Sequence, residues 1–447
     1  MNASRADSSK LMMRAPRSVE KNAVMGAGSW PSSTRSTPAC MLTVVWLIAS
    51  VIWIAAAFTL AFYGAWMSPV ATTETGFARW ASNQLEQNNA GNSALIMINQ
   101  GEVTAEHFSG PQPVDQHTLF ATASFSKWIT ALGVMSLVEQ GVLDLDAPVS
   151  RYLKRWQLPA SEFDHSGVTA RTLLSHTAGL TDGLGYGDYL PDEEIPTLLE
   201  SLRQPRASSG PRNIIVGQPP GEDFTYSGGG YLILQLLVEE VTGRSFAQHI
   251  QQTVFNPLGM SRSTYDYLGD QSNHSANFDE TGRIVPTYRY ASAAATGLSA
   301  SADDLTQLVR GLTTANPKRP IKSDTLAQML MPHGYFAGSA IWGLGTMLYV
   351  TDNMGNPVFG HDGANDPAIN ATVRINPSNQ QGIIVITSGA ALLATTIGSE
   401  WVLWQTGYPD FLFAERAILS ALVPTIAGTT SILLLLLLMR RLSESRT

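Results

Sequence analysis

A serine and a lysine stand three positions apart in the segment Ser124-Phe-Ser-Lys127. The segment opens a run with apolar residues at helical spacing, which predicts a helix over 124–139 that Gly141 ends. Residues three apart lie on one face of a helix, about one turn from each other. Lys127 could therefore take the proton of Ser124 if burial or neighbouring groups keep its amine neutral. Because the helix N-terminus also brings backbone N–H groups near a reacting carbonyl, the segment indicates a serine nucleophile for acyl transfer.

The same spacing recurs at Ser18 and Lys21, in a basic stretch where no enzyme site could form. A Ser-x-x-Lys pair by itself is therefore weak evidence for catalysis. The hypothesis depends on the residues that accompany Ser124 further along the chain.

A tyrosine in a glycine-rich segment comes next, in Phe224-Thr-Tyr226-Ser-Gly-Gly-Gly230, before a predicted helix over 231–241. Such a turn can present the phenol of Tyr226 to a cleft as a proton carrier. Taken alone, the pattern also fits a half-buried core tyrosine beside a flexible turn. The glycine run lacks the following Lys-Ser/Thr of a phosphate-binding loop.

The third segment is Val358-Phe-Gly-His361-Asp-Gly363-Ala364, at the end of one predicted strand and before the next. Gly363 would let the backbone approach a ligand closely, and a main-chain N–H nearby could stabilise an oxyanion. A second His-x-Gly begins at His165, so the pattern is weak alone. Only the copy at His361 follows the tyrosine and adjoins strands.

The elements that must position these residues are both strands and helices. Strands at both ends of the chain surround a helical middle, which implies one sheet assembled from distant segments, an α+β arrangement. Hydrophobic patterning predicts strands at 94–98, 103–107, 344–350, 357–360, 369–375 and 382–387, and helices at 76–88, 124–139, 231–241 and 391–404.

Together these segments resemble the serine β-lactamase and penicillin-binding protein superfamily, and within it the class C β-lactamase-related serine hydrolases. The resemblance covers roughly residues 75–405, and supporting segments follow in the family's order at 173–180, 220–221, 256–260 and 296–305. It implies an α/β sandwich, in which helices flank an antiparallel sheet, plus an all-helical region. The active site is then expected between the sheet and the helical region.

The resemblance also implies a role for each candidate residue. Ser124 would be the nucleophile, Lys127 the residue that activates it, and Tyr226 the general base and acid. His361 would take the place where β-lactamases usually have the lysine of Lys-Thr-Gly. The backbone N–H groups of Ser124 and Ala364 would form the oxyanion hole.

Two positions depart from the family pattern. Gly228 stands where the usual Tyr-x-Asn motif has its asparagine, which removes a hydrogen-bond partner for a substrate amide. With His361 in place of lysine, carboxylate recognition should be weaker and pH-dependent, because a histidine is largely neutral at pH 7. Both departures speak against a strong β-lactamase.

No cofactor and no metal are expected. The other histidines show no ligand spacing, and a single cysteine excludes a disulfide scaffold and a cysteine-based zinc site. His176, in Ser-His-Thr-Ala-Gly-Leu, is expected to tie down a turn rather than to do chemistry.

Two apolar runs without charges predict membrane spans. The first, 41–66, is long enough to cross a bilayer at roughly 20 residues per span, and the second, 417–439, is interrupted by Pro424 before a leucine run. The alternatives are a cleavable signal peptide, whose apolar region is shorter, and a buried core helix. Charged residues make up only 14 % of the chain, against roughly 25 % in an average soluble domain, which supports the spans.

Both ends of the chain are basic. The leader 1–40 holds six basic and two acidic residues, and the tail 440–447 holds three and one. The positive-inside rule then predicts cytoplasmic ends and an outer domain over 75–413, on a bacterial inner membrane. The net charge of −8 leaves that domain strongly acidic, which does not fit a nucleic-acid binder. Membrane lipid and a small-molecule or peptide substrate are the expected partners.

Three functional hypotheses follow. The first is a membrane-anchored serine hydrolase that acts through an acyl-enzyme on Ser124, with peptides, esters or β-lactams as substrates. The second is a non-hydrolytic envelope protein that binds wall peptides with a degenerate site. The third is a membrane sensor whose outer domain is acylated. Retention of Ser124, Lys127 and Tyr226 together favours the first, and the short tails argue against the third.

Overall fold

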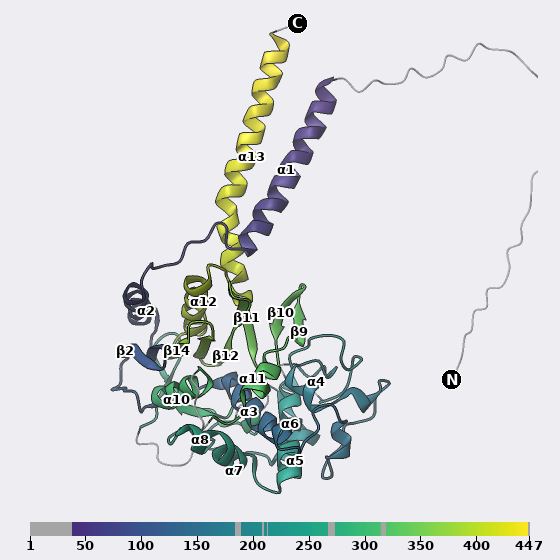
Figure 1. Ribbon diagram of the computed structural model, residues 1–447, viewed down its shortest axis with the longest axis vertical. Coiled ribbons are helices and arrows are strands. Elements are labelled where there is room, and N and C mark those ends of the chain that lie inside the picture. Colours follow the sequence, from purple (N-terminus) through teal and green to yellow (C-terminus); the bar gives the residue numbers. More distant parts are fainter. Residues whose placement is uncertain are drawn as a thin grey trace, which may run out of the picture.

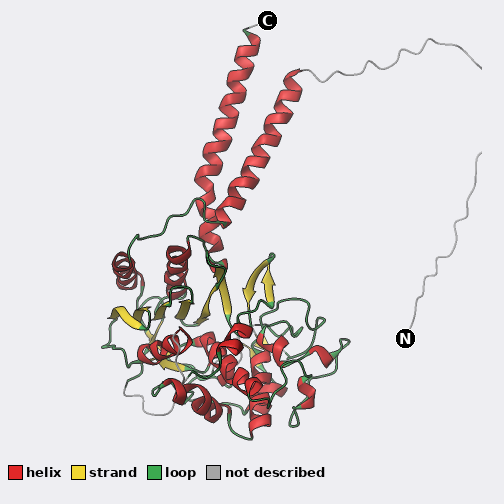
Figure 2. Cartoon of the chain, in the orientation of Figure 1, coloured by secondary structure: helices red, strands yellow, loops and turns green. Residues whose placement is uncertain are grey.

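The protein is described by a computed structural model in which one domain carries two long helices (Figures 1 and 2). The described residues are 38–183, 189–207, 210–211, 213–266, 273–313 and 319–445. The leader predicted over 1–40, with Ser18 and Lys21, lies outside them except for its last three residues, and so do the last two residues of the tail.

The sheet has eight antiparallel strands in the order β2-β1-β14-β13-β12-β11-β10-β9. The first hairpin pairs with the last strand, so that Leu95 stands opposite Val385. The prediction of one sheet built from distant segments is thereby confirmed. The strands are β1 (Ser93–Asn99), β2 (Glu102–Ser109), β9 (Gly334–Phe336), β10 (Ser339–Trp342), β11 (Met347–Thr351), β12 (Pro357–Asn365), β13 (Ile369–Asn376) and β14 (Gln381–Ser388).

Two of the predicted strands differ most from the structure in their bounds, whereas the others differ by one or two residues at an end. The strand expected over 344–350 begins at Met347, because Gly345 takes a positive φ in a turn and donates to Leu174 O. The strand expected over 357–360 continues to Asn365. Its polar residue Asp362 is accommodated inside the sheet because Arg374 on β13 pairs with it.

Each face of the sheet packs against helices, as alternation along a strand requires. On β1, Leu95 and Met97 join a cluster that includes Phe77 of α2 (Glu74–Asn88) and Trp401 of α12 (Leu393–Thr406). Ala94, Ile96 and Ile98 point the other way, into the main core. The predicted flanking of an antiparallel sheet by helices is confirmed.

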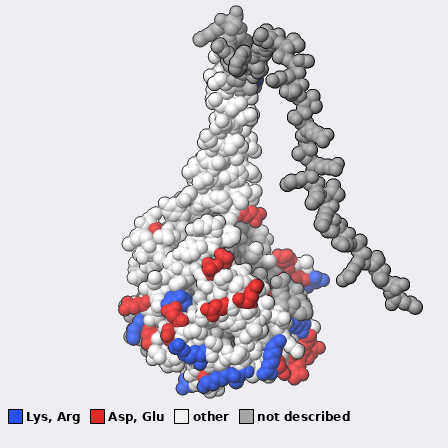
Figure 3. Space-filling model, turned by 90° about the vertical axis from the view of Figure 1, so that its right-hand side faces the viewer, with Lys and Arg blue, Asp and Glu red and all other residues white. Residues whose placement is uncertain are grey.

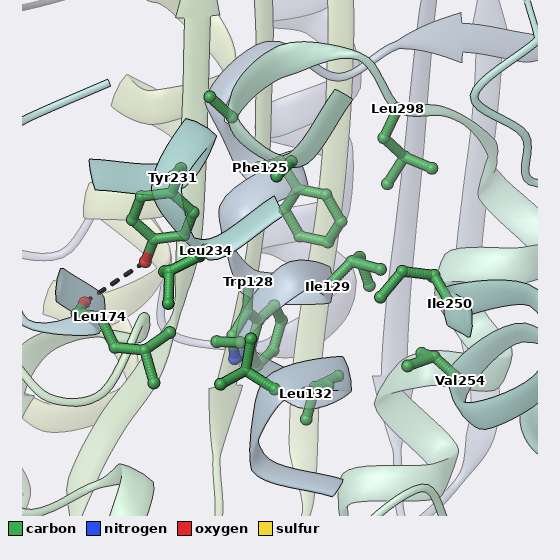
Figure 4. Packing of buried hydrophobic residues seen from close by; sticks show 14 of the residues in the cluster. Phe125, Trp128, Ile129, Leu132, Leu174, Tyr231, Leu234, Ile250, Val254 and Leu298 are labelled. Carbon is green, nitrogen blue, oxygen red and sulfur yellow. Dashed lines mark hydrogen bonds between the residues drawn. The ribbon is translucent and has the colours of Figure 1, made fainter. Parts of the chain in front are cut away.

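The main core joins the sheet to the helical region, and α3 runs through its centre. Figure 4 shows Phe125, Trp128, Ile129 and Leu132 surrounded by side chains of other helices, and Tyr231 donating to Leu174 O at 3.3 Å. Helices of this region are α3 (Ser126–Glu139), α4 (Ala170–Leu174), α5 (Leu198–Arg203), α6 (Gly229–Thr242), α7 (Phe246–Ile250), α8 (Asn256–Leu258), α9 (Ala293–Thr296), α10 (Ala302–Thr313) and α11 (Ser323–Met329).

Short strand pairs complete the domain. The pair of β3 (Leu119–Ala121) and β8 (Ser299–Ser301) lies just before the first candidate residue and links it to α9. The others are β4 (Arg206–Ala207) with β5 (Gly210–Pro211), and β6 (Asn277–Phe278) with β7 (Ile284–Val285).

The two long helices, α1 (Pro38–Phe62) and α13 (Ala414–Glu444), lie side by side and project from the domain (Figure 1). Each is long and apolar enough to cross a membrane. Pro424 lies inside α13 without ending it, and its carbonyl accepts a hydrogen bond of 3.1 Å from Trp53 Nε1 of α1. A side chain at Gly428 would collide with that indole, so α13 needs a small residue there to approach α1 closely.

Candidate active site

One cavity of 320 Å³ brings most of the sequence-predicted residues together. Ser124, Lys127, Tyr226, Gly228 and Ala364 all line it. The rest of the lining comes from α9, the end of β12 and the segment before α12, namely Ala295, Thr296, Asn365, Asp366, Ala391 and Leu392. The cavity therefore lies where the sheet meets the helical region.

Ser124 lies in a 3₁₀ turn, Ala123–Phe125, and not in the first turn of the predicted helix, which begins at Ser126. Ala123 has a φ of +49°, a left-handed conformation that costs a residue with a Cβ about 1–2 kcal/mol. Ser126 holds the turn, because its Oγ donates to Ala123 O at 2.7 Å and accepts from Leu298 N at 3.0 Å. This 3₁₀ turn directs the Ser124 side chain toward the cavity, and Ser124 is half-buried there.

Lys127 is buried in the first turn of α3 beside the serine. Its Nζ donates to Ser124 Oγ at 3.2 Å and to Ala295 O at 3.0 Å. The same Nζ lies 5.0 Å from the ring centre of Tyr226 and 5.4 Å from that of Tyr231. Among the residues that the structure describes, no carboxylate forms an ion pair with Lys127. This geometry suits the transfer of a proton between the hydroxyl and the amine.

Tyr226 is held by a histidine and an aspartate from other parts of the chain. The His176 ring stacks on the Tyr226 ring at 4.2 Å, and its Nδ1 accepts from Ser227 N at 3.1 Å. Asp182 accepts from Ser227 Oγ at 2.6 Å and from Gly229 N at 2.9 Å. These bonds fix the loop in front of α6, so that the tyrosine faces the cavity.

The prediction that His176 ties down a turn is confirmed by those contacts. Burial is the main cause that holds the pKa of His176 well below its usual value, with a smaller contribution from the nearby Lys127, so the neutral ring serves as an acceptor. The sequence did not predict that Asp182 fixes the loop that carries Tyr226. Asp182 stands 45 positions from Ser227, and no spacing along the chain connects them.

Gly363 lies against the backbone of the serine turn. A Cβ at this position would stand 2.1 Å from Thr122 O and 3.0 Å from Ser124 N. Those distances leave no room for a side chain, so β12 and the turn approach each other backbone to backbone.

The free edge of β12 faces the same turn. Its pairing with β11 ends at Gly360, whereas its pairing with β13 continues to Asn365. Asp362 N–H points to the β11 side, where it meets Met347 Sδ at 3.2 Å. Because N–H direction alternates along a strand, the N–H of Ala364 points to that side too, past the end of β11. Backbone donors of Ser124 and Ala364 thus border one cavity.

His361 lies behind the cavity rather than in its lining. The ring is buried, its Nδ1 is 2.5 Å from Asp362 O, and Trp342 packs edge-on at 5.3 Å. Burial, with the nearby Lys127 charge, lowers the pKa of His361 to about 3. The geometry therefore does not support the pH-dependent pairing with a substrate carboxylate that the sequence suggested.

A buried ion cluster, which sequence reasoning missed, supports β12 from behind. Arg374 Nη2 lies 2.8 Å from Asp362 Oδ2, and Nη1 pairs with Asp410. Tyr349 OH donates to Asp362 Oδ1 at 2.7 Å, and Thr372 donates to the same oxygen. Burial alone would raise the pKa of Asp362, but the charge of Arg374 and these hydrogen bonds lower it below its usual value.

Metal ligands do not gather in the described part of the chain: no group of three or more His, Cys, Asp or Glu side chains there could hold a metal ion. The polar side chains of the described lining are those of Ser124, Lys127, Tyr226, Thr296, Asn365 and Asp366. The serine, lysine and tyrosine among them suit acyl transfer.

Comparison with known families gives one match over most of the chain. The β-lactamase family matches residues 77–398. Among curated proteins, penicillin-binding protein 4* of Bacillus subtilis is 30 % identical over 178 residues, which are 38 % of this chain and 37 % of that protein. Esterase EstB of Burkholderia gladioli is 34 % identical over 176 residues, 37 % of this chain and 43 % of the esterase. The matched part thus spans about two fifths of these relatives.

Solved structures share the fold at lower identity. The octameric penicillin-binding protein homologue from Pyrococcus abyssi superposes with a TM-score of 0.62 at 22 % identity, over 75 % of this chain and 78 % of that one. A β-lactamase/D-alanine carboxypeptidase from Pseudomonas syringae superposes with a TM-score of 0.58 at 17 % identity, over 73 % and 98 %.

Proposed function

Since the chain belongs to the β-lactamase family of serine hydrolases, we propose that it is a membrane-anchored serine hydrolase that forms an acyl-enzyme on Ser124. The observation that carries the proposal is the 3.2 Å hydrogen bond from Lys127 Nζ to Ser124 Oγ. That pair borders a cavity that Tyr226 and the end of β12 also line.

Acylation begins when Ser124 Oγ attacks the carbonyl carbon of the substrate. The neutral amine of Lys127 takes the hydroxyl proton as the bond to carbon forms. Tyr226 gives its phenol proton to the leaving group as that bond breaks, and the Lys127 ammonium returns a proton to Tyr226. The backbone N–H groups of Ser124 and Ala364 stabilise the negative oxygen of the tetrahedral intermediate. Water then attacks the acyl-enzyme, with the same residues as the base, and releases the acid.

Neutral esters suit this cavity better than substrates that carry a carboxylate. Among the described lining residues, Lys127 is the one basic side chain, and it is already bonded to the serine, whereas Asp366 adds an acidic group. Gly228 provides no amide to hold a substrate side chain. A β-lactam is therefore expected to acylate Ser124, but the resulting acyl-enzyme should be hydrolysed slowly, because small misplacements of the acyl group cost about 10²-fold in rate. The similarity to an esterase supports the preference.

The two long helices anchor the enzyme in this proposal. Helices α1 and α13 cross the bacterial inner membrane, and the residues between them form the catalytic domain on the outer side. The basic residues at both ends support cytoplasmic termini under the positive-inside rule.

The test uses the purified full chain in detergent with p-nitrophenyl butyrate. Ser124→Ala should abolish turnover, and Lys127→Ala and Tyr226→Phe should each lower kcat by at least the ~10²-fold typical of losing a proton carrier. After incubation with benzylpenicillin, intact-mass spectrometry should detect an adduct that maps to the Ser124 peptide.

Ser18→Ala is the matched control, because Ser18 heads the second Ser-x-x-Lys of the chain, and it should leave turnover unchanged. Wild-type turnover by Ser124→Ala would remove the nucleophile assignment. Rapid hydrolysis of a chromogenic cephalosporin without a trapped adduct would refute the proposed preference for esters.

A further inference from the structure

A second and larger hollow lies at the base of the two long helices. This groove, the basal groove, has a volume of 580 Å³, compared with 320 Å³ for the catalytic cavity. Its walls come from the end of α1, the β9–β10 hairpin, the end of β11 and the start of α13. Its principal side chains are Phe62, Tyr63, Phe336, Tyr408, Phe411 and Ala414.

The described lining is largely apolar and aromatic, and its polar side chains other than Asp410 carry only hydroxyl groups. Asp410 is the one charged residue among the described lining, and its carboxylate is occupied by Arg374 and by Leu412 N. The groove therefore has no free charge for an ionic ligand, whereas an aliphatic chain would bury its surface there at no electrostatic cost.

Exposed aromatic side chains continue the groove outward. Phe336 and Tyr335 on the β9–β10 hairpin are 68 % and 55 % exposed, although large apolar side chains seldom face water together. The turn of this hairpin points to the side from which the long helices leave the domain (Figure 1). Figure 3 shows, on the face in view, an uncharged surface along the middle of the stem that those helices form, whereas charged side chains lie on the domain. The charged residues of α13 lie near its two ends.

The position of the groove identifies the occupant. Phe62 is the last residue of α1 and Ala414 the first of α13, so the groove opens at the level where both proposed spans leave the membrane. Phe336 shares the groove with Phe62 and Tyr63, which puts the hairpin tip at the same level. Aromatic side chains at that depth favour the membrane interface.

We propose that the basal groove binds an acyl chain of a phospholipid from the adjoining leaflet, and that Phe336 and Tyr335 enter the membrane interface beside it. This inference rests on the membrane anchoring of the proposed function but not on the chemistry of Ser124. The hairpin then forms a third membrane contact, which fixes the orientation of the domain above the bilayer.

The test is photolabelling of the full chain in phosphatidylcholine nanodiscs that contain a phosphatidylcholine with a diazirine on its acyl chain. Peptides with Phe336 and with Tyr408–Phe411 should be labelled at least about tenfold more than the peptide with Ile284, because burying a few methylenes is enough for that preference. Ile284 is a matched control, since it is 65 % exposed and belongs to another hairpin, on β7.

A variant that fills the groove sharpens the test. Ala340→Trp places a large ring in the lining and should reduce labelling of the Tyr408–Phe411 peptide, while labelling of α1 and α13 and ester hydrolysis remain. Two outcomes would overturn this inference but not the proposed anchoring. One is labelling of the helices with a hairpin labelled no more than the Ile284 peptide, and the other is an unchanged labelling pattern in Ala340→Trp. Unlabelled helices would overturn both the inference and the proposed anchoring.

Discussion

At the scale of single residues, two neutral histidines lie behind the serine. The rings of His176 and His361 pack against Trp342 at 4.8 Å and 5.3 Å. Burial lowers the pKa of both, and the charge of Lys127 lowers them further. They therefore add no charge behind the cavity at neutral pH, and they make the fold sensitive to acid.

The sign of that sensitivity follows from the direction of the shifts. Between the unfolded pKa of roughly 6.5 and the folded pKa of about 3 for His361, the unfolded chain binds more protons than the folded chain. The free energy of unfolding should then fall as the pH falls through this window, by about 1.4 kcal/mol per pH unit for each such group. His361→Asn keeps a hydrogen-bond donor toward Asp362 O but has no titrating group. It should therefore remove the contribution of His361 to the pH dependence of the free energy of unfolding.

The measurement is denaturant unfolding of the full chain in detergent between pH 4 and pH 7. The variant should show a shallower pH dependence than the wild type, while His176 retains its own contribution. Equal slopes in the two proteins would mean that His361 is not held neutral in the folded state.

At the scale of elements, the contact of β12 with the serine turn is the tightest in the site. Gly363→Ala would put a methyl group 2.1 Å from Thr122 O, and the turn would have to move away from β12. A displacement of about 1 Å at a reacting group can cost 10²-fold in rate, so kcat for ester hydrolysis should fall by about that factor.

Gly230→Ala in α6 is the control for this substitution. Its added Cβ would meet Ser227 Oγ at 3.4 Å, an ordinary contact, and alanine favours a helix over glycine by about 1 kcal/mol. This variant should keep both its activity and its thermal stability. Full activity in Gly363→Ala would contradict this prediction, because it would show that the serine turn can move away from β12 without a loss of kcat.

Much of this arrangement could be predicted from local pattern. The apolar run 94–98, followed by a turn with Gly101 and by the segment 103–107, indicated the β1–β2 hairpin, and apolar residues at helical spacing indicated α3. The strand around Asp362 was shortened in the prediction, because a charged residue next to Gly363 is typical of a loop. Its partner Arg374 lies on the next strand, and no local signal reveals that such a charge is neutralised inside the sheet. Ion pairs between residues on different strands, such as this one, cannot be predicted from local patterns in a single sequence.

At the scale of the whole molecule, that ion cluster connects the site to the base of α13. Asp362 precedes Gly363 on β12, Arg374 bridges to Asp410, and Asp410 caps the turn before α13 by accepting from Leu412 N. Tyr349 belongs to both regions, since its ring lines the basal groove and its hydroxyl bonds to Asp362. Removing one partner of a buried ion pair costs about 3–5 kcal/mol, so the domain and the start of α13 are held as one unit.

The orientation of that unit across the membrane gives the final prediction. Gly355 lies in the turn between β11 and β12, where an added Cβ would meet no atom within 4 Å, so the turn can accept an inserted domain. A reporter that is active only outside the cytoplasm, inserted at Gly355, should be active, and the same reporter fused after Thr447 should be silent, because basic ends are retained in the cytoplasm. Each fusion needs a matched measurement of its abundance, so that silence is not mistaken for degradation. The opposite pattern would place the catalytic cavity in the cytoplasm and remove extracytoplasmic peptides and esters as substrates.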